Sequence, residues 1–579
     1  MRRWRAFSIF TVLGLVLAAC GGQGQSTSPS ASGAPSVQPS VSSGPFAPMS
    51  YPASGPADCK AKGYNGEMKE IKAVDEHTVQ FSLCYPDGSF LSKIAFSAFQ
   101  IQDSQYLQTA MISHLLLARP VGTGPYMLKE WQRGDHMTLQ ANPNYWGDKP
   151  LVSTVVVKWS SEAAQRLVEL QAGTVDGIDN PGTDDFKTIE ANPALKLYKR
   201  AGLNIAYLGF NNQPKATGFD NSKNPMANEK VRQAIAMGID RKRIVDNFYP
   251  AGSTVADFFT PCEIKYGCVG DKWYGFDAAA AKKMLADAGF PNGFTTKISL
   301  RDVVRGYLPD PKSVAQEIQS QLKNNLGITT TIDVQESGAY LDNASAGKLT
   351  GLYLLGWGAD YPDQTDFVDY HFGQGASDQF GAKFPDLVAA IQKGAQSADD
   401  AVRTSAYTEV NKLIKQHVPM IPLAHGASAT AFKADVSGAY AAPLTDERFA
   451  VMKPASGDQL TFMQNAEPIS LYCGDETDGE TLRLCEQINQ GLYTYKVGGT
   501  DAVPDLATEC TPSSDQLTWT CKLRQNVKFS NGSSFDANDV VTSYALEWDT
   551  KHPLHIGRTA AFDYWKGLFG NFLNPAPPA

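Results

Sequence analysis

The chain has 579 residues and a formal net charge of −9 at pH 7, with 51 Lys and Arg against 60 Asp and Glu. An acidic chain repels polyanions, which argues against nucleic acid as a partner. The length exceeds what one hydrophobic core supports, so we expect two or three lobes.

The N-terminus carries the pattern of a lipoprotein signal. Three arginines precede an apolar run over 6–19 that is too short to span a bilayer, and small residues then lead into Cys20. We expect a signal peptide over 1–19 and a lipid on the Cys20 thiol that anchors the protein at the membrane. The alternative is an ordinary secretory signal with an incidental cysteine. Residues 20–50 are rich in Ser, Pro and Gly, which predicts a disordered tether. The remainder is expected to be extracytoplasmic, at the cell surface or in the periplasm.

Apolar periodicity predicts strands that alternate with helices. The expected strands cover 78–83, 204–210, 297–300, 329–334 and 352–357, and the expected helices cover 160–173, 228–238, 241–248, 278–288, 313–325 and 399–416. Such alternation indicates an α/β protein with mixed sheets.

The cysteines predict disulfides. Removal of Cys20 from the nine cysteines leaves eight, an even number in an oxidising compartment. Local spacing favours the pairs Cys59–Cys84, Cys262–Cys268, Cys473–Cys485 and Cys510–Cys521. Metal binding is the alternative, but the chain has no CxxC motif and no clustered histidines, so we expect no metal and no cofactor.

Several motifs occur in an order that identifies a family. They are VGTGPY at 121–126, NPNYWG at 142–147, GTVDGID at 173–179, KVRQAIAMGIDR at 230–241, GWGADYPD at 356–363 and VPMIPL at 418–423. Together they resemble the landmarks of the peptide/nickel-type (family 5, oligopeptide/dipeptide-binding-like) extracytoplasmic solute-binding proteins of ABC transporters. The resemblance covers essentially all of 55–573.

The opening landmarks of that family come last in this chain. The segment 527–544 resembles its "VKFHDG…F.A.DVV.S" signature, which in the family lies near the start of the mature protein. A circular permutation explains this order most simply, with the old ends joined through 443–457 and a new break that separates Phe572 from Ala57. The alternative is a scrambled or concatenated assembly whose C-terminal segment pairs with another copy.

The resemblance implies a two-lobed periplasmic-binding-protein clamshell of the large cluster C type, with an extra subdomain in lobe I. We expect lobe I to comprise 51–204 and 426–579, with the family's N-terminal segment moved to the C-terminus, and lobe II to comprise 205–425. The protein would be a monomer that captures a small solute, most simply short peptides, and delivers it to the permease subunits of an ABC importer.

The motif at 356–363 provides the candidate ligand site. In peptide-binding members the residue that matches Asp360 pairs with the α-ammonium of the peptide, and the residue that matches Trp357 lines a side-chain pocket. The neighbouring Tyr361 and the strand-end residues Tyr207 and Asn211 are further candidates. The alternatives are structural: Asp360 as a turn cap, Trp357 as core, and Tyr207 and Asn211 as turn-making residues. Gln364 stands where the family usually has Pro, which puts the shape of this loop and the ligand class in question.

Other functions are less well supported. The chain has no GxSxG, HExxH, Walker A or GxGxxG pattern with its acidic partner, so we do not expect an enzyme. A ligand-sensing receptor with the same fold remains an alternative. Within transport, oligosaccharides, opines and metal chelates are the alternative ligands.

Overall fold

The computed structural model describes residues 45–200, 202–213 and 224–575. The signal peptide over 1–19, Cys20 and most of the tether lie outside the described residues. Residues 43–579 form one compact unit, to which the following description applies. No helix in the described ranges is long and apolar enough to cross a membrane.

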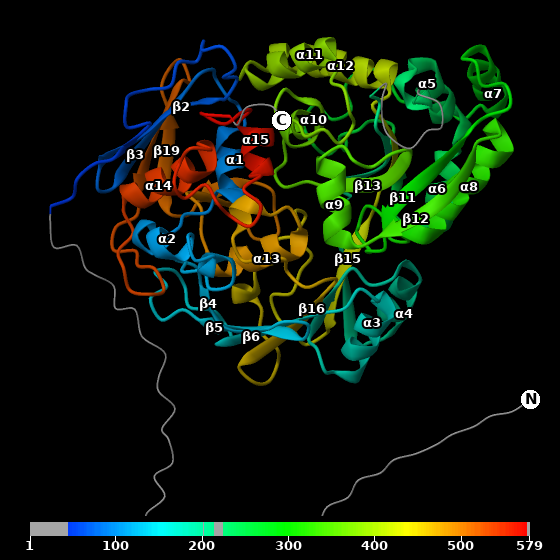
Figure 1. The fold of residues 1–579 in the computed structure, drawn as a ribbon. Coiled ribbons are helices and arrows are strands. Elements are labelled where there is room, and N and C mark those ends of the chain that lie inside the picture. The colour runs from blue at the N-terminus through cyan, green and yellow to red at the C-terminus, as the bar shows by residue number, and fades with distance from the viewer. Residues whose placement is uncertain (1–44, 201, 214–223, 576–579) are drawn as a thin grey trace, which may run out of the picture. The chain divides into compact units, whose positions relative to one another are not determined.

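A seven-stranded sheet is built from both halves of the chain. Its order is β4 (Tyr126–Gln132), β5 (His136–Ala141), β6 (Thr154–Trp159), β16 (Gln459–Gln464), β7 (Gly177–Asp179), β15 (Ser428–Lys433) and β8 (Leu195–Arg200). Strand β16 runs parallel to both of its neighbours, β6 and β7 (Figure 1). The C-terminal part of the chain therefore supplies an interior strand of this sheet.

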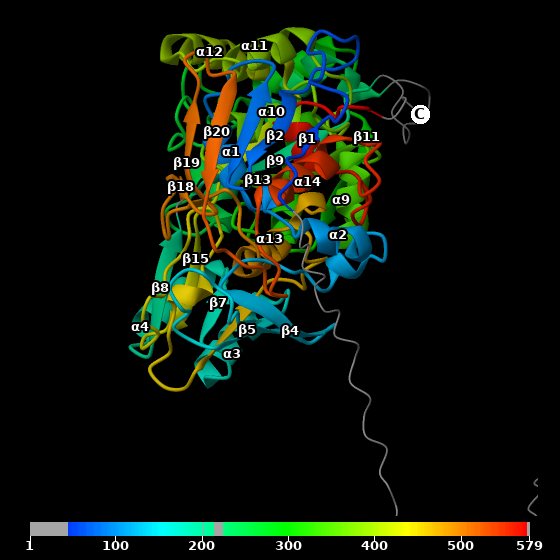
Figure 2. The same ribbon diagram turned by 90° about the vertical axis from the view of Figure 1, so that its left-hand side faces the viewer.

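A five-stranded sheet is completed in the same way. Its order is β1 (Ser50–Tyr51), β2 (Met68–Asp75), β3 (Thr78–Leu83), β20 (Thr518–Leu523) and β19 (Ala507–Pro512). β20 pairs antiparallel with β3, and Figure 2 shows β19 and β20 beside the N-terminal strands. Helix α14 (Ala537–Trp548) packs on this sheet, where Tyr544 meets Phe81 edge to face. Residues beyond 457 therefore complete both sheets.

A six-stranded mixed sheet lies within 204–425. Its order is β10 (Thr254–Val255), β14 (Met420–His425), β9 (Asn204–Phe210), β13 (Leu352–Gly358), β11 (Thr295–Arg301) and β12 (Thr329–Gln335). Every residue of the interior strand β9 is buried, and neighbouring strands pair with it on both edges.

Helices complete the unit. They are α1 (Phe90–Ala95), α2 (Ser104–Ala110), α3 (Ala163–Ala172), α4 (Phe186–Ala191), α5 (Glu229–Gly238), α6 (Arg241–Phe248), α7 (Ala278–Asp287), α8 (Pro311–Leu326), α9 (Ser337–Ser345), α10 (Gln364–Phe372), α11 (Pro385–Ala395), α12 (Asp400–His417), α13 (Gly479–Ile488) and α15 (Asp563–Leu568), with the strand pair β17 (Tyr493–Tyr495) and β18 (Ala502–Pro504). The helices expected from periodicity agree within three residues at each end. Helix α3 stops at Gly173, which takes the left-handed conformation at φ 77°.

The chain passes twice between the seven-stranded and six-stranded sheets, from β8 to β9 and from β14 to β15. Asn204 connects the two crossings: its amide nitrogen donates to the Gly426 carbonyl at 2.7 Å, and its amide oxygen accepts from the Gly426 N–H at 2.8 Å. Gly426 has no room for a side chain, because a Cβ would lie 2.1 Å from the Gly306 carbonyl oxygen. The two connections are therefore held together at one point.

All four expected disulfides are present. They are Cys59–Cys84, Cys262–Cys268, Cys473–Cys485 and Cys510–Cys521. Cys510 and Cys521 lie directly opposite each other on β19 and β20, with their Cα atoms 4.0 Å apart. The antiparallel register of β19 and β20 therefore explains this pair.

A chain that ends at Gly457 should not fold to a soluble monomer. It lacks β16, β19 and β20, so the edges of β6, β7 and β3 are left unpaired. We expect aggregation on expression, and no cooperative unfolding transition by circular dichroism in any soluble fraction.

A matched control cuts the full chain at the same place without removing anything. Residues 455–459 are exposed, so a protease site inserted after Ser456 should be cleaved with both fragments still associated in gel filtration. A soluble truncated chain with a cooperative transition like that of the full protein would contradict the interior placement of β16.

Candidate binding site

A large cavity is lined by residues from the seven-stranded and the six-stranded sheets and their loops. Its volume is about 1210 Å³. Ligand sites for drug-sized molecules typically enclose about 300–1,000 Å³, so this cavity suits a ligand of several residues. Trp357 and Asp360 line it from the end of β13, and Arg483 and Glu476 line it from α13 and the turn before it.

The end of β13 is positioned by an acid that the sequence analysis missed. Asp366, in the first turn of α10, accepts a hydrogen bond from the Trp357 indole nitrogen at 3.2 Å and another from the Asp360 backbone N–H at 2.9 Å. The Trp357 ring also stacks on Tyr370 with the ring centroids 4.0 Å apart. The motif is therefore a fixed wall of the cavity. No spacing rule points to Asp366, because its role depends on the tertiary turn between β13 and α10.

Asp360 has an unsatisfied carboxylate oxygen. Its side chain is partly accessible to the cavity, but Oδ2 is buried and has no hydrogen-bond partner among the described residues. Burial raises the pKa of Asp360 to about 8, and the neighbouring Tyr564 hydroxyl only partly offsets this. An ammonium group placed against this oxygen would supply both a hydrogen bond and a counter-charge.

The other residues proposed from the sequence lie in different places. Tyr207 borders the cavity with a buried ring, and its hydroxyl contacts the Gln379 amide. Asn211 is outside the lining, where its amide donates to the Gly347 carbonyl at 2.8 Å. Tyr361 is also outside the lining, fully buried, and donates to the Thr365 hydroxyl at 2.9 Å. Ligand contacts by these three residues stay predictions.

A buried ring of four charges supports the opposite wall. Arg483 donates to Asp179 at 2.7 Å and to Glu447 at 3.0 Å, and Arg200 contacts the same two carboxylates. The four side chains come from β7, β8, α13 and the segment before residue 448, so they connect distant parts of the chain. Burial alone would raise the pKa of Asp179, but Arg483 and Arg200 hold it well below its usual range. Only Asp179 was visible as part of a sequence motif, because its partners lie far away in the chain.

One ion pair joins the loop after β11 to helix α13 across the cavity. Arg305 donates both terminal nitrogens to Glu480, at 2.8 and 3.0 Å. The Asn465 amide donates to the adjacent Val304 carbonyl at 3.0 Å. Within the described residues, no group of three or more His, Cys, Asp or Glu side chains is placed to hold a metal ion.

Comparison with known proteins identifies the family. The profile of "Bacterial extracellular solute-binding proteins, family 5 Middle" matches residues 31–379 and 501–561, which is more than half of the chain. This protein belongs to family 5 of the bacterial extracellular solute-binding proteins. Members of the family serve ABC importers as binding proteins and not as enzymes, as the missing catalytic motifs predicted.

Individual relatives cover about two thirds of the chain. Heme-binding protein A of Haemophilus influenzae is 28% identical over 67% of this chain and 70% of its own. The dipeptide-binding protein of Escherichia coli is 28% identical over 66% of this chain and 71% of its own.

Solved structures agree with the fold. The periplasmic binding protein DppA from Helicobacter pylori, in complex with the peptide STSA, superposes with a TM-score of 0.61 at 26% identity, over 68% of this chain and 75% of its own. The dipeptide-binding protein of Pseudoalteromonas sp. SM9913, in complex with Met-Leu, superposes with a TM-score of 0.62 at 25% identity. The match covers 68% of this chain and 76% of that protein. The fold is therefore the expected α/β, two-lobed clamshell of the family 5 type.

Replacing Asp179→Asn should lower the free energy of unfolding by about 3 kcal/mol, because it leaves two buried arginines short of a counter-charge. Since the folded pKa of Asp179 is depressed, its stabilisation is present above the ordinary Asp pKa and is lost as the pH falls below it. The difference in unfolding free energy between the wild type and the variant, measured by urea unfolding, should therefore become smaller in acid.

Asp184→Asn is the matched control, because this nearby carboxylate is exposed. It should unfold like the wild type. A stability of Asp179→Asn equal to that of the control at pH 7 would contradict a supporting role for the charge ring.

Proposed function

We propose that this protein is the lipid-anchored binding component of an ABC importer, and that it captures short peptides between its two lobes and delivers them to the permease. The observation that carries the ligand class is the buried Oδ2 of Asp360 at the wall of the cavity, which has no hydrogen-bond partner in the described ranges. A peptide has an α-ammonium to pair with this oxygen, and the adjacent ring of Trp357 offers apolar surface for a side chain.

Other ligand classes fit these groups less well. A neutral oligosaccharide offers no positive group to the Asp360 carboxyl, so the charge-assisted pair that an ammonium would form is absent. Opines and metal chelates bring acidic groups of their own toward this carboxylate. The peptide complexes of two similar structures also favour peptides. A ligand-sensing receptor would use the same cavity, and transport is preferred because the family serves ABC importers.

We propose that the chain is circularly permuted, with lobe I formed by 51–204 and 426–579 and lobe II by 205–425. Strands β16, β19 and β20 pair within the same chain, which favours one permuted monomer over an assembly completed by another copy. The separated family matches at 31–379 and 501–561 are consistent with a moved segment. The anchor at Cys20 rests on the signal pattern alone.

Replacing Asp360→Asn should weaken the binding of a neutral tripeptide such as Ala-Ala-Ala by tenfold or more in isothermal titration calorimetry. The physical reason is the loss of the charge-assisted hydrogen bond to the ammonium, and tenfold corresponds to about 1.4 kcal/mol.

Two controls separate this effect from damage to the fold. Asp378→Asn removes an exposed carboxylate at the cavity and should bind normally. The pKa of Asp360 is higher in the folded protein than in the unfolded chain. The free energy of unfolding therefore falls as the pH rises from about 4 to 8. Asp360→Asn should therefore raise the melting temperature at pH 8 but not at pH 4. Unchanged peptide affinity in this variant would assign Asp360 to structure.

Peptide affinity should rise between pH 6 and pH 8. Below its pKa of about 8 the Asp360 carboxyl is protonated and must release a proton before it pairs with a cation. Each pH unit should therefore raise the affinity by up to about tenfold, until the peptide ammonium loses its own proton near pH 8. Calorimetry in buffers of different ionisation enthalpy should detect proton release at pH 6.5. A flat affinity without proton release would contradict the burial of this group.

A further inference from the structure

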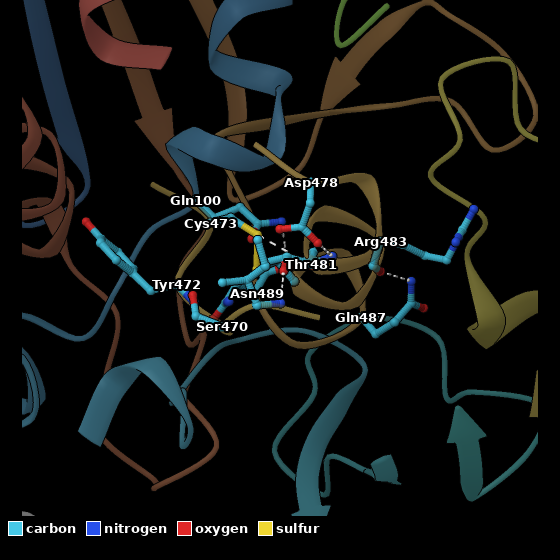
Figure 3. The surroundings of a disulfide bond; sticks show 11 residues. Gln100, Ser470, Tyr472, Cys473, Asp478, Thr481, Arg483, Gln487 and Asn489 are labelled. Atoms are coloured by element: carbon cyan, nitrogen blue, oxygen red, sulfur yellow. Dashed lines mark hydrogen bonds between the residues drawn. A yellow bond between two sulfur atoms is a disulfide. The ribbon is translucent and has the colours of Figure 1, made fainter. Parts of the chain in front are cut away.

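The turn before α13 brings an unusual concentration of carboxylates to the cavity. The sequence Asp-Glu-Thr-Asp-Gly-Glu over 475–480 places four acidic side chains in its lining. The turn is held at its base by the Cys473–Cys485 disulfide, and Figure 3 shows Asp478 above the start of the helix beside Cys473. Its position is therefore fixed by covalent structure.

Two of the four carboxylates have hydrogen-bond partners at both oxygens. Asp475 accepts hydrogen bonds from the backbone N–H groups of Thr559, Ala560, Ala561 and Phe562. Glu480 is paired with Arg305 through both oxygens. These acids hold the chain in place.

Glu476 and Asp478 each keep one oxygen free. Glu476 accepts from Arg558 through Oε1 at 2.7 Å, and Asp478 caps α13 by accepting from the Thr481 N–H through Oδ1 at 2.9 Å. Glu476 Oε2 and Asp478 Oδ2 are buried and have no hydrogen-bond partner within the described part of the chain. The two residues are only 2% and 7% exposed, so water cannot fully solvate these oxygens.

Their surroundings disfavour the bare negative charge. Burial raises the pKa of Glu476 to about 7, and Arg558 lowers it less than burial raises it. Burial and then the charge of Glu480 raise the pKa of Asp478 to about 6. A positive group beside either carboxylate would lower this penalty.

Apart from Arg558 at Glu476 Oε1, no Lys or Arg among the described residues forms a salt bridge with either carboxylate. Acidic side chains outnumber Lys and Arg in the lining. Three of the lining arginines, Arg200, Arg305 and Arg483, are paired with other carboxylates, and Arg558 contacts only Oε1 of Glu476. The free oxygens of Glu476 and Asp478 therefore favour a ligand that carries positive charge.

We propose that Glu476 and Asp478 form a second cation-binding subsite, so that the preferred ligands carry a basic side chain, such as Lys or Arg, in addition to the ammonium group that pairs with Asp360. This inference rests on the proposed peptide function and narrows its substrate class. The two acidic positions belong to different lobes, so a dicationic ligand would contact both and favour their closure.

The test compares tripeptides that differ by one charge. Tripeptides of alanine with lysine at position 2 or 3 are titrated by calorimetry against the same peptides with norleucine, which has the same chain without the ammonium. We expect lysine to bind at least tenfold more tightly at one of the positions. In the double variant Glu476→Gln, Asp478→Asn the ratio between the lysine and norleucine affinities should fall below threefold.

The variants are chosen to keep the fold. Asn remains a good helix cap and Gln can still accept from Arg558, and a cooperative thermal unfolding transition reports an intact fold. Asp378→Asn should keep the lysine preference. Equal affinity for lysine and norleucine peptides at both positions, or a preference that survives in the double variant, would overturn the subsite but leave the proposed function in place. Failure of every peptide to bind the wild type would overturn both.

Discussion

The parallel insertion of β16 between β6 and β7 is the constraint on which the rest of the structure depends. A parallel strand inside a sheet must hydrogen-bond on both edges, so β16 can be neither omitted nor moved outward. The chain leaves β16 into the turn that precedes α13, and this path places Arg483 in the buried charge ring and Glu476 and Asp478 at the cavity. The pairing of β16 thus explains how a segment late in the sequence contributes charged residues to the cavity.

The buried carboxylates fall into two groups with opposite behaviour. Asp179 is surrounded by two arginines, and its pKa is held down because every oxygen has a partner. Asp360, Glu476 and Asp478 each have an oxygen without a partner among the described residues, and burial raises their pKa values. The first arrangement stabilises the fold, and the second lowers stability until a cation arrives. The balance between burial and charged partners therefore differs between Asp179 and the three ligand-binding candidates.

Features set by local spacing could be predicted from the sequence, and features set by tertiary contacts could not. The disulfide Cys510–Cys521 follows from two strand-like runs around a turn, and helix α3 ends where its glycine predicts. The family motifs pointed to Trp357 and Asp360. Asp366 and Glu447 were missed, because their partners are brought to them by strand crossings and loops that no periodicity encodes. The acidic residues at 475–480 can be read in the sequence, but their burial at a cavity could not be predicted from it.

The central claim, that the cavity takes short peptides with a basic side chain, is tested most directly by mass spectrometry of the ligands that copurify with the protein. The purified full chain is denatured, and the released small molecules are sequenced by fragmentation. The account predicts a mixture of short peptides enriched in Lys and Arg relative to a peptide pool prepared from the same cells. Recovery of sugars, opines or a metal complex with no peptide would contradict it.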